Sequence, residues 1–331
     1  MYNFYQSKVR KDIQKEVYKN PTFDITLFGK NYFGVIKTKK IWPFDFKWYQ
    51  ILWLEMLDSD VFVEKAILDI KKKFGNSNKN IFFQLGIVNQ MVRFENAAHI
   101  APEFRHDLRE VRLGLRKNLE EKYLLKSSFR ENMPQAGIVY DVTKSDEQLL
   151  KDMNESCRKR VKKSIGKWLE FRVVEKNQYE VFFAKWQETA GKKWFNTISK
   201  TQYNNLLKYL SDDKWMLIGA FLEREMIAGT ICLFDGEFVI CPYGFYDRNF
   251  NNIWVQHFLK FKLFVWAREH GFAYVDTGGG APTGFPEHEL TGVTEFKESL
   301  GGEKIEYYGN YDVVLNGWLY KVFKLWYKFK K

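Results

Sequence analysis

Cysteine is scarce in this chain of 331 residues, and several common catalytic patterns are missing. Cys157, Cys232 and Cys241 are the only cysteines, and no CxxC pair occurs. This supports neither a disulfide framework nor a zinc ribbon, and it fits a reducing compartment. GxSxG, HExxH and GxxxxGK[ST] are also absent, so a serine hydrolase, a zincin and a P-loop protein lose their sequence support.

Long apolar runs and metal-ligand spacings are missing too. No uninterrupted apolar stretch is long enough to span a bilayer, and residues 1–20 lack the apolar core of a signal peptide. We therefore expect a cytoplasmic protein, either free or at the inner face of the membrane. The five histidines show no ligand spacing, so we expect no bound metal.

Positive charge and apolar side chains are abundant instead. Lys and Arg number 52 against 41 Asp and Glu, a formal net charge of +11. This excess favours nucleic acid, a phosphorylated ligand or anionic lipid as partner, although a basic soluble surface has the same composition. Apolar residues make up 45% of the chain, and its length favours about two domains.

Two segments show the same order of predicted elements, namely strand, strand, helix and strand. The first comprises residues 34–40, 48–60, 61–75 and 81–87, and the second comprises 228–234, 237–252, 253–271 and 272–280. A helical crossover joins parallel neighbours, so the last two strands of each segment should lie parallel. We place one domain at residues 1–144 and a second at 145–309.

The region between these segments predicts a basic helix. Ser145 and Gln148 form a capping-box start, and apolar residues then recur every three or four positions as far as Ile165. The opposite face includes Arg158, Arg160, Lys162 and Lys163. Such a face is either simply solvated or contacts phosphates without regard to sequence.

The C-terminal residues 316–331 alternate aromatics and lysines. One helical face collects Trp318, Leu319, Val322, Leu325, Trp326 and Phe329. Such a face fits a helix docked on the core, or an interfacial helix on anionic lipid. We expect docking, with residues 310–331 completing the first domain.

The second segment resembles the acyl-CoA-binding core of GNAT acyltransferases. In that fold a helix N-terminus receives a pyrophosphate on a loop of form [RQ]xxGx[GA]. The matching loop here reads RNFNNI, with Asn251 and Ile253 where a small residue lets phosphate reach the backbone. The resemblance predicts an α/β fold of two GNAT-like domains, each a mixed twisted sheet flanked by helices, and the loop argues against coenzyme A.

A longer signature follows. HGFAYVDTGGG and GVTEFKESLGGEKIEYYGNYDVV resemble the C-terminal signature of the FemABX family, the aminoacyl-tRNA-dependent transferases that build the interpeptide bridge of peptidoglycan. The family pattern is a Y-D-x-G-G strand end, a variable loop and G-[LV]-x-x-F-K-x-x-[FL]-G-G. Matching positions are Asp276, Gly278, Gly279, Gly292, Phe296, Lys297, Gly301 and Gly302. The resemblance covers most of residues 131–315, whereas residues 1–130 agree mainly in layout.

The chain departs from the family pattern at three places. Lys192 stands where T-x-x-R-x-x-F has arginine, which keeps the charge and loses the bidentate fork. Cys241 replaces the first tyrosine of Y-x-Y-G and leaves Tyr243. There is no room between residues 166 and 189 for the coiled-coil arm of longer members, so we expect none.

The resemblance implies an enzyme that transfers an amino acid from aminoacyl-tRNA to an amine of a peptidoglycan precursor stem peptide, with no further cofactor. Lys297, on a predicted turn, would stabilise the tetrahedral oxyanion of ester aminolysis. Alternatively it snorkels to solvent. Asp276 is a candidate base for the acceptor amine, or a turn residue that accepts from backbone N–H groups.

Family positions imply the remaining contacts. The acceptor, UDP-MurNAc-pentapeptide or a lipid-linked precursor, would contact Lys37, Lys192, Tyr243, Phe296, Gly278 and Gly279. The tRNA would contact Arg158, Arg160, Lys162 and Lys163. Two rivals stay open, an acyl-CoA-dependent N-acyltransferase and a non-enzymatic module that binds RNA or a membrane surface. We expect a monomer.

Overall fold

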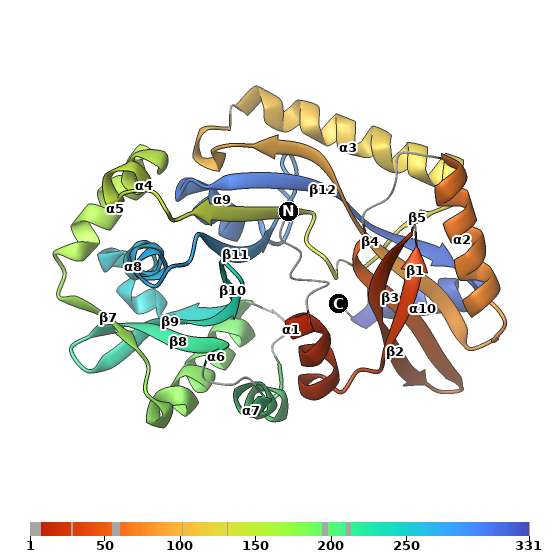
Figure 1. Ribbon diagram of the computed structural model, residues 1–331, viewed down its shortest axis with the longest axis horizontal. Helices are drawn as coiled ribbons and strands as arrows, with labels where there is room; N and C mark the ends of the chain where they lie inside the picture. The colour runs from red at the N-terminus through yellow and green to blue at the C-terminus, as the bar shows by residue number, and fades with distance from the viewer. Residues whose placement is uncertain are drawn as a thin grey trace.

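The computed structural model describes residues 8–27, 29–54, 60–100, 102–130, 132–193, 198–209 and 213–330 (Figure 1). In chain order the elements are α1 (Lys8–Asp12), the π-helical turn η2 (Ile13–Val17), β1 (Thr22–Leu27), β2 (Lys30–Ile41), β3 (Phe44–Leu54), α2 (Asp60–Phe74), β4 (Asn80–Phe94), η3 (Ala97–His99), α3 (Pro102–Tyr123), β5 (Lys126–Ser127), β6 (Ala136–Asp141), α4 (Asp146–Asp152), α5 (Glu155–Ile165), β7 (Leu169–Val173), η4 (Lys176–Gln178), α6 (Tyr179–Lys193), α7 (Lys200–Tyr209), β8 (Trp215–Leu222), β9 (Glu225–Asp235), β10 (Phe238–Tyr246), η5 (Arg248–Ile253), α8 (Val255–Glu269), β11 (Tyr274–Gly280), α9 (Thr291–Ser299), β12 (Glu303–Val314) and α10 (Gly317–Lys330).

The described strands form one twelve-stranded sheet in the order β1-β2-β3-β4-β12-β6-β11-β10-β9-β8-β7, with β5 paired to β12. Two neighbouring pairs are parallel, β3 with β4 and β10 with β11. The crossover helices α2 and α8 have fifteen residues each, about four turns. The mixed α/β class and both parallel pairs are as the sequence predicts.

Strand β12 joins the two halves of this sheet. It pairs along most of its length with β4, and its first four residues also pair with β6 on the other side. Figure 1 shows it crossing the molecule between the half that contains α8 and the half that contains α2. The predicted domains therefore share one continuous sheet.

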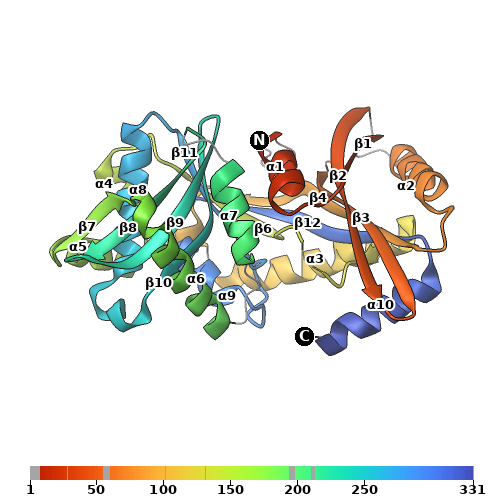
Figure 2. The same cartoon turned by 90° about the horizontal axis from the view of Figure 1, so that it is seen from below.

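Helices cover both faces of each half (Figure 2). In the second half, α4, α5 and α8 pack on one face around Cys157 and Phe264, while α6, α7 and η2 pack on the other around Phe182. In the first half, α2 and α3 cover one face, and α10 covers the other around Phe82. Turn η2 lies near the N-terminus of the chain, yet its buried residues belong to the core of the second half.

The basic helix begins where the sequence predicts, but it is interrupted. The Ser145 hydroxyl accepts a hydrogen bond from the N–H of Gln148, as a capping residue should. Met153 and Asn154 then adopt extended backbone, and the Asn154 side chain accepts from the N–H of Cys157. A second N-cap therefore restarts the helix, so the single predicted helix is wrong.

Helix α10 docks on the sheet as predicted, but through only part of the predicted face, since Leu319 is buried and Val322 and Trp326 pack against the same core. Leu319, Tyr320 and Phe323 are buried, whereas Trp318 and Phe329 are 60% and 82% exposed. Tyr320, which lies outside the predicted face, donates its hydroxyl proton to a carboxylate oxygen of the buried Asp312 at 2.8 Å. Among the described helices, none combines the length and apolarity needed to cross a bilayer.

Candidate active site

Two parallel strands diverge at the centre of the second half. β10 and β11 pair only at Phe238–Ile240 with Tyr274–Asp276. Beyond this point the register shifts in both strands, between Ile240 and Tyr243 and between Asp276 and Gly279. Because β10 no longer pairs with β11 beyond Asp276, the backbone carbonyls of the next residues can accept hydrogen bonds from a side chain instead.

Lys297 reaches into this divergence from the last turn of α9. Its Nζ donates to the carbonyl oxygen of Gly279 at 2.7 Å and to that of Gly278 at 3.2 Å. Burial, with the nearby ammonium of Lys260, lowers the pKa of Lys297 to about 8, although the charge of Asp276 opposes the change. The lysine thus lies on a helix rather than the predicted turn, and it points into the protein rather than snorkelling.

The ammonium keeps a hydrogen-bonding capacity beyond these contacts. It has three N–H donors, and the two carbonyls take two of them. Among the described residues no third acceptor bonds it, which leaves one N–H for an oxygen of a bound molecule. A buried cation whose pKa is lowered by burial is typical of functional sites.

Asp276 and the glycines after it form the end of β11. Its Oδ1 accepts from the N–H of Gly278 at 2.7 Å, as the turn interpretation predicts. Burial raises the pKa of Asp276, while the Gly278 bond and the Lys297 charge oppose that rise. Gly278 has a φ of +80°, and a Cβ at Gly279 would lie 2.1 Å from the Pro134 ring. Glycine is therefore required here by local backbone geometry as well as by any ligand.

These residues line a cavity of about 700 Å³ over β6, β11 and β12. Its wall includes Asp276, Gly278 and Gly279, so the carbonyls that hold Lys297 belong to residues of the cavity wall. Polar and aromatic side chains complete the lining, among them Arg93 and Tyr307. The volume suits a ligand of substrate size.

Phe296 lies next to Lys297 on α9 and is half-buried. Its ring meets that of His257 edge to face, with centroids 5.1 Å apart. Burial and the charge of Arg160 lower the pKa of His257 to about 4, so this histidine is neutral at pH 7. Phe296 therefore connects α9 to the start of α8.

Lys37 lies in the first half of the chain, on β2, and is half-buried. Burial and the charges of Arg10 and Arg130 lower its pKa to about 8. The Arg130 guanidinium is itself held 5.0 Å from the ring centroids of Trp48 and Tyr327. Three neighbouring cations make this a place of concentrated positive potential, which favours an anion.

Tyr243 lies on β10 beyond the divergence. Its hydroxyl is hydrogen-bonded to that of Tyr18, and its ring packs 4.9 Å from that of Trp186. It therefore ties the N-terminal segment to the second half. Lys192 lies near the end of α6, but its side chain falls outside the described residues, as does all of Phe195.

The four predicted tRNA contacts lie on α5. Arg160, Lys162 and Lys163 are exposed, and Arg158 is half-buried. Lys163 places its ammonium 5.5 Å from the ring centroid of Trp254, the residue just before α8. The basic face therefore adjoins the N-terminus of α8 and is separate from the Lys37 cluster in the first half.

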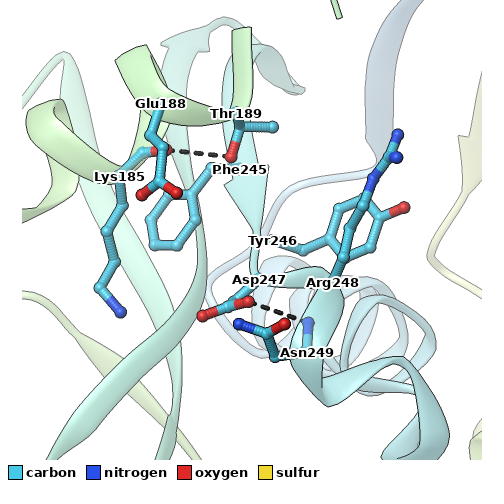
Figure 3. A pocket seen from close by; sticks show the side chains of 8 residues that line it. All are labelled: Lys185, Glu188, Thr189, Phe245, Tyr246, Asp247, Arg248 and Asn249. Carbon is cyan, nitrogen blue, oxygen red and sulfur yellow. Dashed lines mark hydrogen bonds between the residues drawn. The ribbon is translucent and has the colours of Figure 1, made fainter. Parts of the chain in front are cut away.

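The loop that corresponds to the pyrophosphate cradle of GNAT proteins is the 3₁₀ helix η5. The Asp247 carboxylate accepts from the N–H of Asn249 at 2.9 Å (Figure 3). Figure 3 also shows Lys185, Glu188 and Thr189 of α6 facing this loop, across a cavity of only about 90 Å³. A carboxylate bonded to the N–H of the second loop residue occupies a donor and repels phosphate.

The structure also contains a buried cluster of charged side chains that the sequence analysis does not predict. Lys304 bonds Glu298 at 2.6 Å and lies 3.2 Å from Glu306, which in turn bonds Arg112 at 2.6 Å. All four side chains are almost fully buried. The available signal is the spacing of Lys304 and Glu306, two residues apart and so on one side of a strand. Within the described ranges, no group of three or more His, Cys, Asp or Glu side chains could hold a metal ion.

Comparisons with known proteins agree with this arrangement. The family model described as an acetyltransferase (GNAT) domain matches residues 156–297. Two lipid II:glycine glycyltransferases are similar in sequence. That of Staphylococcus aureus strain USA300 is 30% identical over 156 residues, which is 45% of this chain and 37% of the relative. That of Staphylococcus saprophyticus is 29% identical over 127 residues, which is 38% and 29% of the two proteins.

The chain thus spans about a third of the length of the curated relatives it matches. The crystal structure of FemX covers 97% of this chain and 94% of its own, with a TM-score of 0.66 at 16% identity, a likeness of fold. The predicted two-domain GNAT-like fold is confirmed. These matches also confirm the predicted resemblance to the Fem family of peptidoglycan bridge transferases.

Proposed function

We propose that this chain is an aminoacyltransferase that moves an amino acid from the ester of aminoacyl-tRNA to an amine of a peptidoglycan precursor stem peptide. The observation that carries the proposal is the buried ammonium of Lys297, which is bonded to carbonyls of the cavity wall and has one N–H donor to spare. Similarity to proteins named as lipid II:glycine glycyltransferases supports the class of acceptor.

The chemistry uses groups that lie together. The acceptor amine attacks the ester carbonyl, a C–N bond forms, and the ester oxygen of the tRNA leaves. The carbonyl oxygen becomes an oxyanion on the way, and in this proposal the third N–H of Lys297 binds it. The attacking nitrogen gives up a proton and the departing ribose oxygen gains one. Asp276, which accepts a hydrogen bond from the N–H of Gly278, is the proposed base for the attacking amine.

The acceptor would be anchored by its diphosphate. UDP-MurNAc-pentapeptide and its lipid-linked counterpart both carry one, and the cluster of Lys37, Arg10 and Arg130 offers concentrated positive charge. Tyr243 and Lys192 are the proposed contacts from the second half. A substitution at Lys37 should therefore raise KM for the precursor while leaving kcat nearly unchanged.

The donor tRNA would lie along α5. Arg158, Arg160, Lys162 and Lys163 offer phosphate contacts without sequence preference, so affinity should fall steeply as salt rises. Replacing all four by glutamine should flatten that dependence by a slope of about three to four in log–log form. A dependence that is flat in the wild type would exclude tRNA from this face.

The test of the whole proposal is a transfer assay. The purified protein is incubated with tRNA charged by a labelled amino-acid mixture and with either form of the precursor, and mass spectrometry shows whether the precursor gains an aminoacyl residue. Uncharged tRNA and the Lys297→Met variant are the matched controls. Gain that requires charged tRNA supports the proposal and identifies the amino acid. No gain with either precursor, once folding and charging are verified, refutes it.

A second candidate is an acyl-CoA-dependent N-acyltransferase, which the match to a GNAT acetyltransferase domain favours. The carboxylate of Asp247 at the start of η5 opposes it, because the coenzyme's pyrophosphate would meet a negative charge there. Titration calorimetry with coenzyme A separates the two. Tight saturable binding that the Lys297→Met variant retains would favour this rival.

A further inference from the structure

The outer face of α10 carries an apolar stripe that the fold leaves uncovered. Trp318, Leu325 and Phe329 are spaced by seven and four residues, so they lie on one side of the helix. Their exposed fractions are 60%, 56% and 82%. At the helical rise the stripe is about 16 Å long. Helix α10 therefore has two apolar faces, and only one of them is docked.

The tip of the β2–β3 hairpin extends this stripe. Phe44, at the start of β3, meets Trp318 edge to face with ring centroids 5.3 Å apart. Trp42, two residues earlier, is 88% exposed. Figure 2 shows α10 on the outside of the molecule, beside the hairpin. The exposed Trp42 is thus two residues away in sequence from the ring that contacts Trp318 at this end of the face.

A row of lysines runs beside the stripe. Lys321, Lys324 and Lys328 are spaced by three and four residues, and all are exposed. They line a hollow of about 450 Å³ together with Phe129, Leu325 and Tyr327. An apolar stripe flanked by lysines and tryptophans is the pattern of a helix that lies in the interface of an anionic membrane.

We propose that this face, made of the α10 stripe, the lysine row and Trp42, binds an anionic lipid surface. Charge complementarity selects this occupant. A second copy of the chain would bring a lysine row towards another lysine row, on proteins that each carry a net charge of +11. Anionic headgroups neutralise the lysines while the tryptophans and Phe329 enter the boundary of the acyl chains.

This inference goes beyond the proposed transfer reaction and does not rest on it. Binding to vesicles is measured with the full chain alone, in the absence of tRNA and precursor. A failure of transfer would leave vesicle binding untouched, and a failure of vesicle binding would leave transfer to a soluble acceptor untouched.

The experiment is co-sedimentation with vesicles of phosphatidylcholine, either pure or mixed with phosphatidylglycerol. The wild type should bind the mixed vesicles and not the pure ones. Lys321→Gln, Lys324→Gln and Lys328→Gln combined should weaken binding by about a hundred-fold, because each lysine contributes about five-fold. Trp318→Ser with Phe329→Ser should weaken it by about ten-fold or more, because two large apolar side chains no longer leave water.

Trp168→Ser is the matched control, because Trp168 is 90% exposed but lies between α5 and β7, away from this face. Its binding should equal that of the wild type. Thermal unfolding should be unchanged in the lysine and Trp168 variants, whose side chains are exposed, and should shift by only a few degrees in the Trp318 variant, which loses the ring contact with Phe44.

The proposal is overturned if the wild type fails to sediment with the mixed vesicles, or if the stripe and lysine variants bind as well as the wild type. Sedimentation velocity gives a further outcome. If the wild type self-associates and the stripe variant does not, while vesicle binding is equal in both, the face is an interface between copies, and the lipid proposal is wrong.

Discussion

Replacing Lys297 by methionine separates a functional lysine from a structural one. Methionine has a side chain of similar length, but it lacks the positive charge and the N–H donors of lysine. Loss of one oxyanion donor commonly lowers the rate by about two to three powers of ten. We therefore expect transfer to fall by that factor in single-turnover measurements.

Stability should hardly change in the same variant. The pKa of Lys297 in the folded state, about 8, is below its usual 10.5, so burial disfavours the charged form by about 3 kcal/mol. That unfavourable effect is present in full below pH 8 and fades as pH rises towards 10.5. Methionine removes it, but leaves the carbonyls of Gly278 and Gly279 without their donor, which costs about 1–3 kcal/mol. The two effects nearly offset each other.

The pH dependence gives a sharper readout. If protonated Lys297 binds the oxyanion, kcat should fall as pH rises through about 8. Lys297→Arg should lose this descending limb, because a guanidinium stays charged throughout this range. The reasoning is refuted if Lys297→Met turns over within a few-fold of the wild type while unfolding at the same temperature. A loss of activity matched by a large loss of stability would instead identify a structural lysine.

Three further substitutions follow from the same geometry. Asp276→Asn removes a charge that raises the pKa of Lys297, so the descending limb of the pH profile should move to lower pH. Gly279→Ala places a Cβ 2.1 Å from the ring of Pro134 and should destabilise the protein by about 1–3 kcal/mol in urea unfolding. Lys304→Met leaves two buried carboxylates without their shared cation, and it should cost about 3–5 kcal/mol.

Each of these has a clear contrary result. A pH profile that Asp276→Asn leaves in place would separate that carboxylate from the lysine. Gly114→Ala is the control for the glycine variant, since nothing lies within 4 Å of its Cβ and a helix gains stability from alanine. If Lys304→Met unfolds at the wild-type temperature, the buried cluster contributes little.

The sequence predicts those parts of the structure that depend on local pattern. The two crossover units are read correctly because their periodicities change from strand to helix and back over whole elements. The break before Asn154 is missed because its apolar stripe continues through it, and one polar side chain decides the outcome by capping. The docked face of α10 is predicted only in part: Leu319, Val322 and Trp326 pack on the core, but the sequence does not show that Tyr320 bonds Asp312 on another element.

The sequence motif predicts which residues form the candidate site, but not their hydrogen-bond partners or neighbouring charges. The resemblance locates Asp276 and Lys297, which lie 21 residues apart, but it gives no sign that the ammonium binds the carbonyls of Gly278 and Gly279. Arg10 and Arg130 are equally hidden, because they approach Lys37 only through tertiary folding. No local pattern reports contacts at such separations in sequence.

Two consecutive residues of α9 have different roles: Lys297 bonds the carbonyls at the end of β11, and Glu298 holds the helix in place. Helix α9 has nine residues and no side-chain cap at its start, so it is too short to be stable alone. Glu298 therefore anchors it, through the buried bond to Lys304 on the strand that both halves share. The hydroxyl of Tyr140 adds a second anchor by donating to the carbonyl of Lys297 at 2.8 Å. Because Arg112 of α3 joins the same cluster through Glu306, the position of the Lys297 ammonium depends on a helix of the other half. A substitution at Arg112 should therefore change the pKa of Lys297. The size of that change, taken from the pH dependence of kcat in the variant and the wild type, measures how strongly the two halves are coupled.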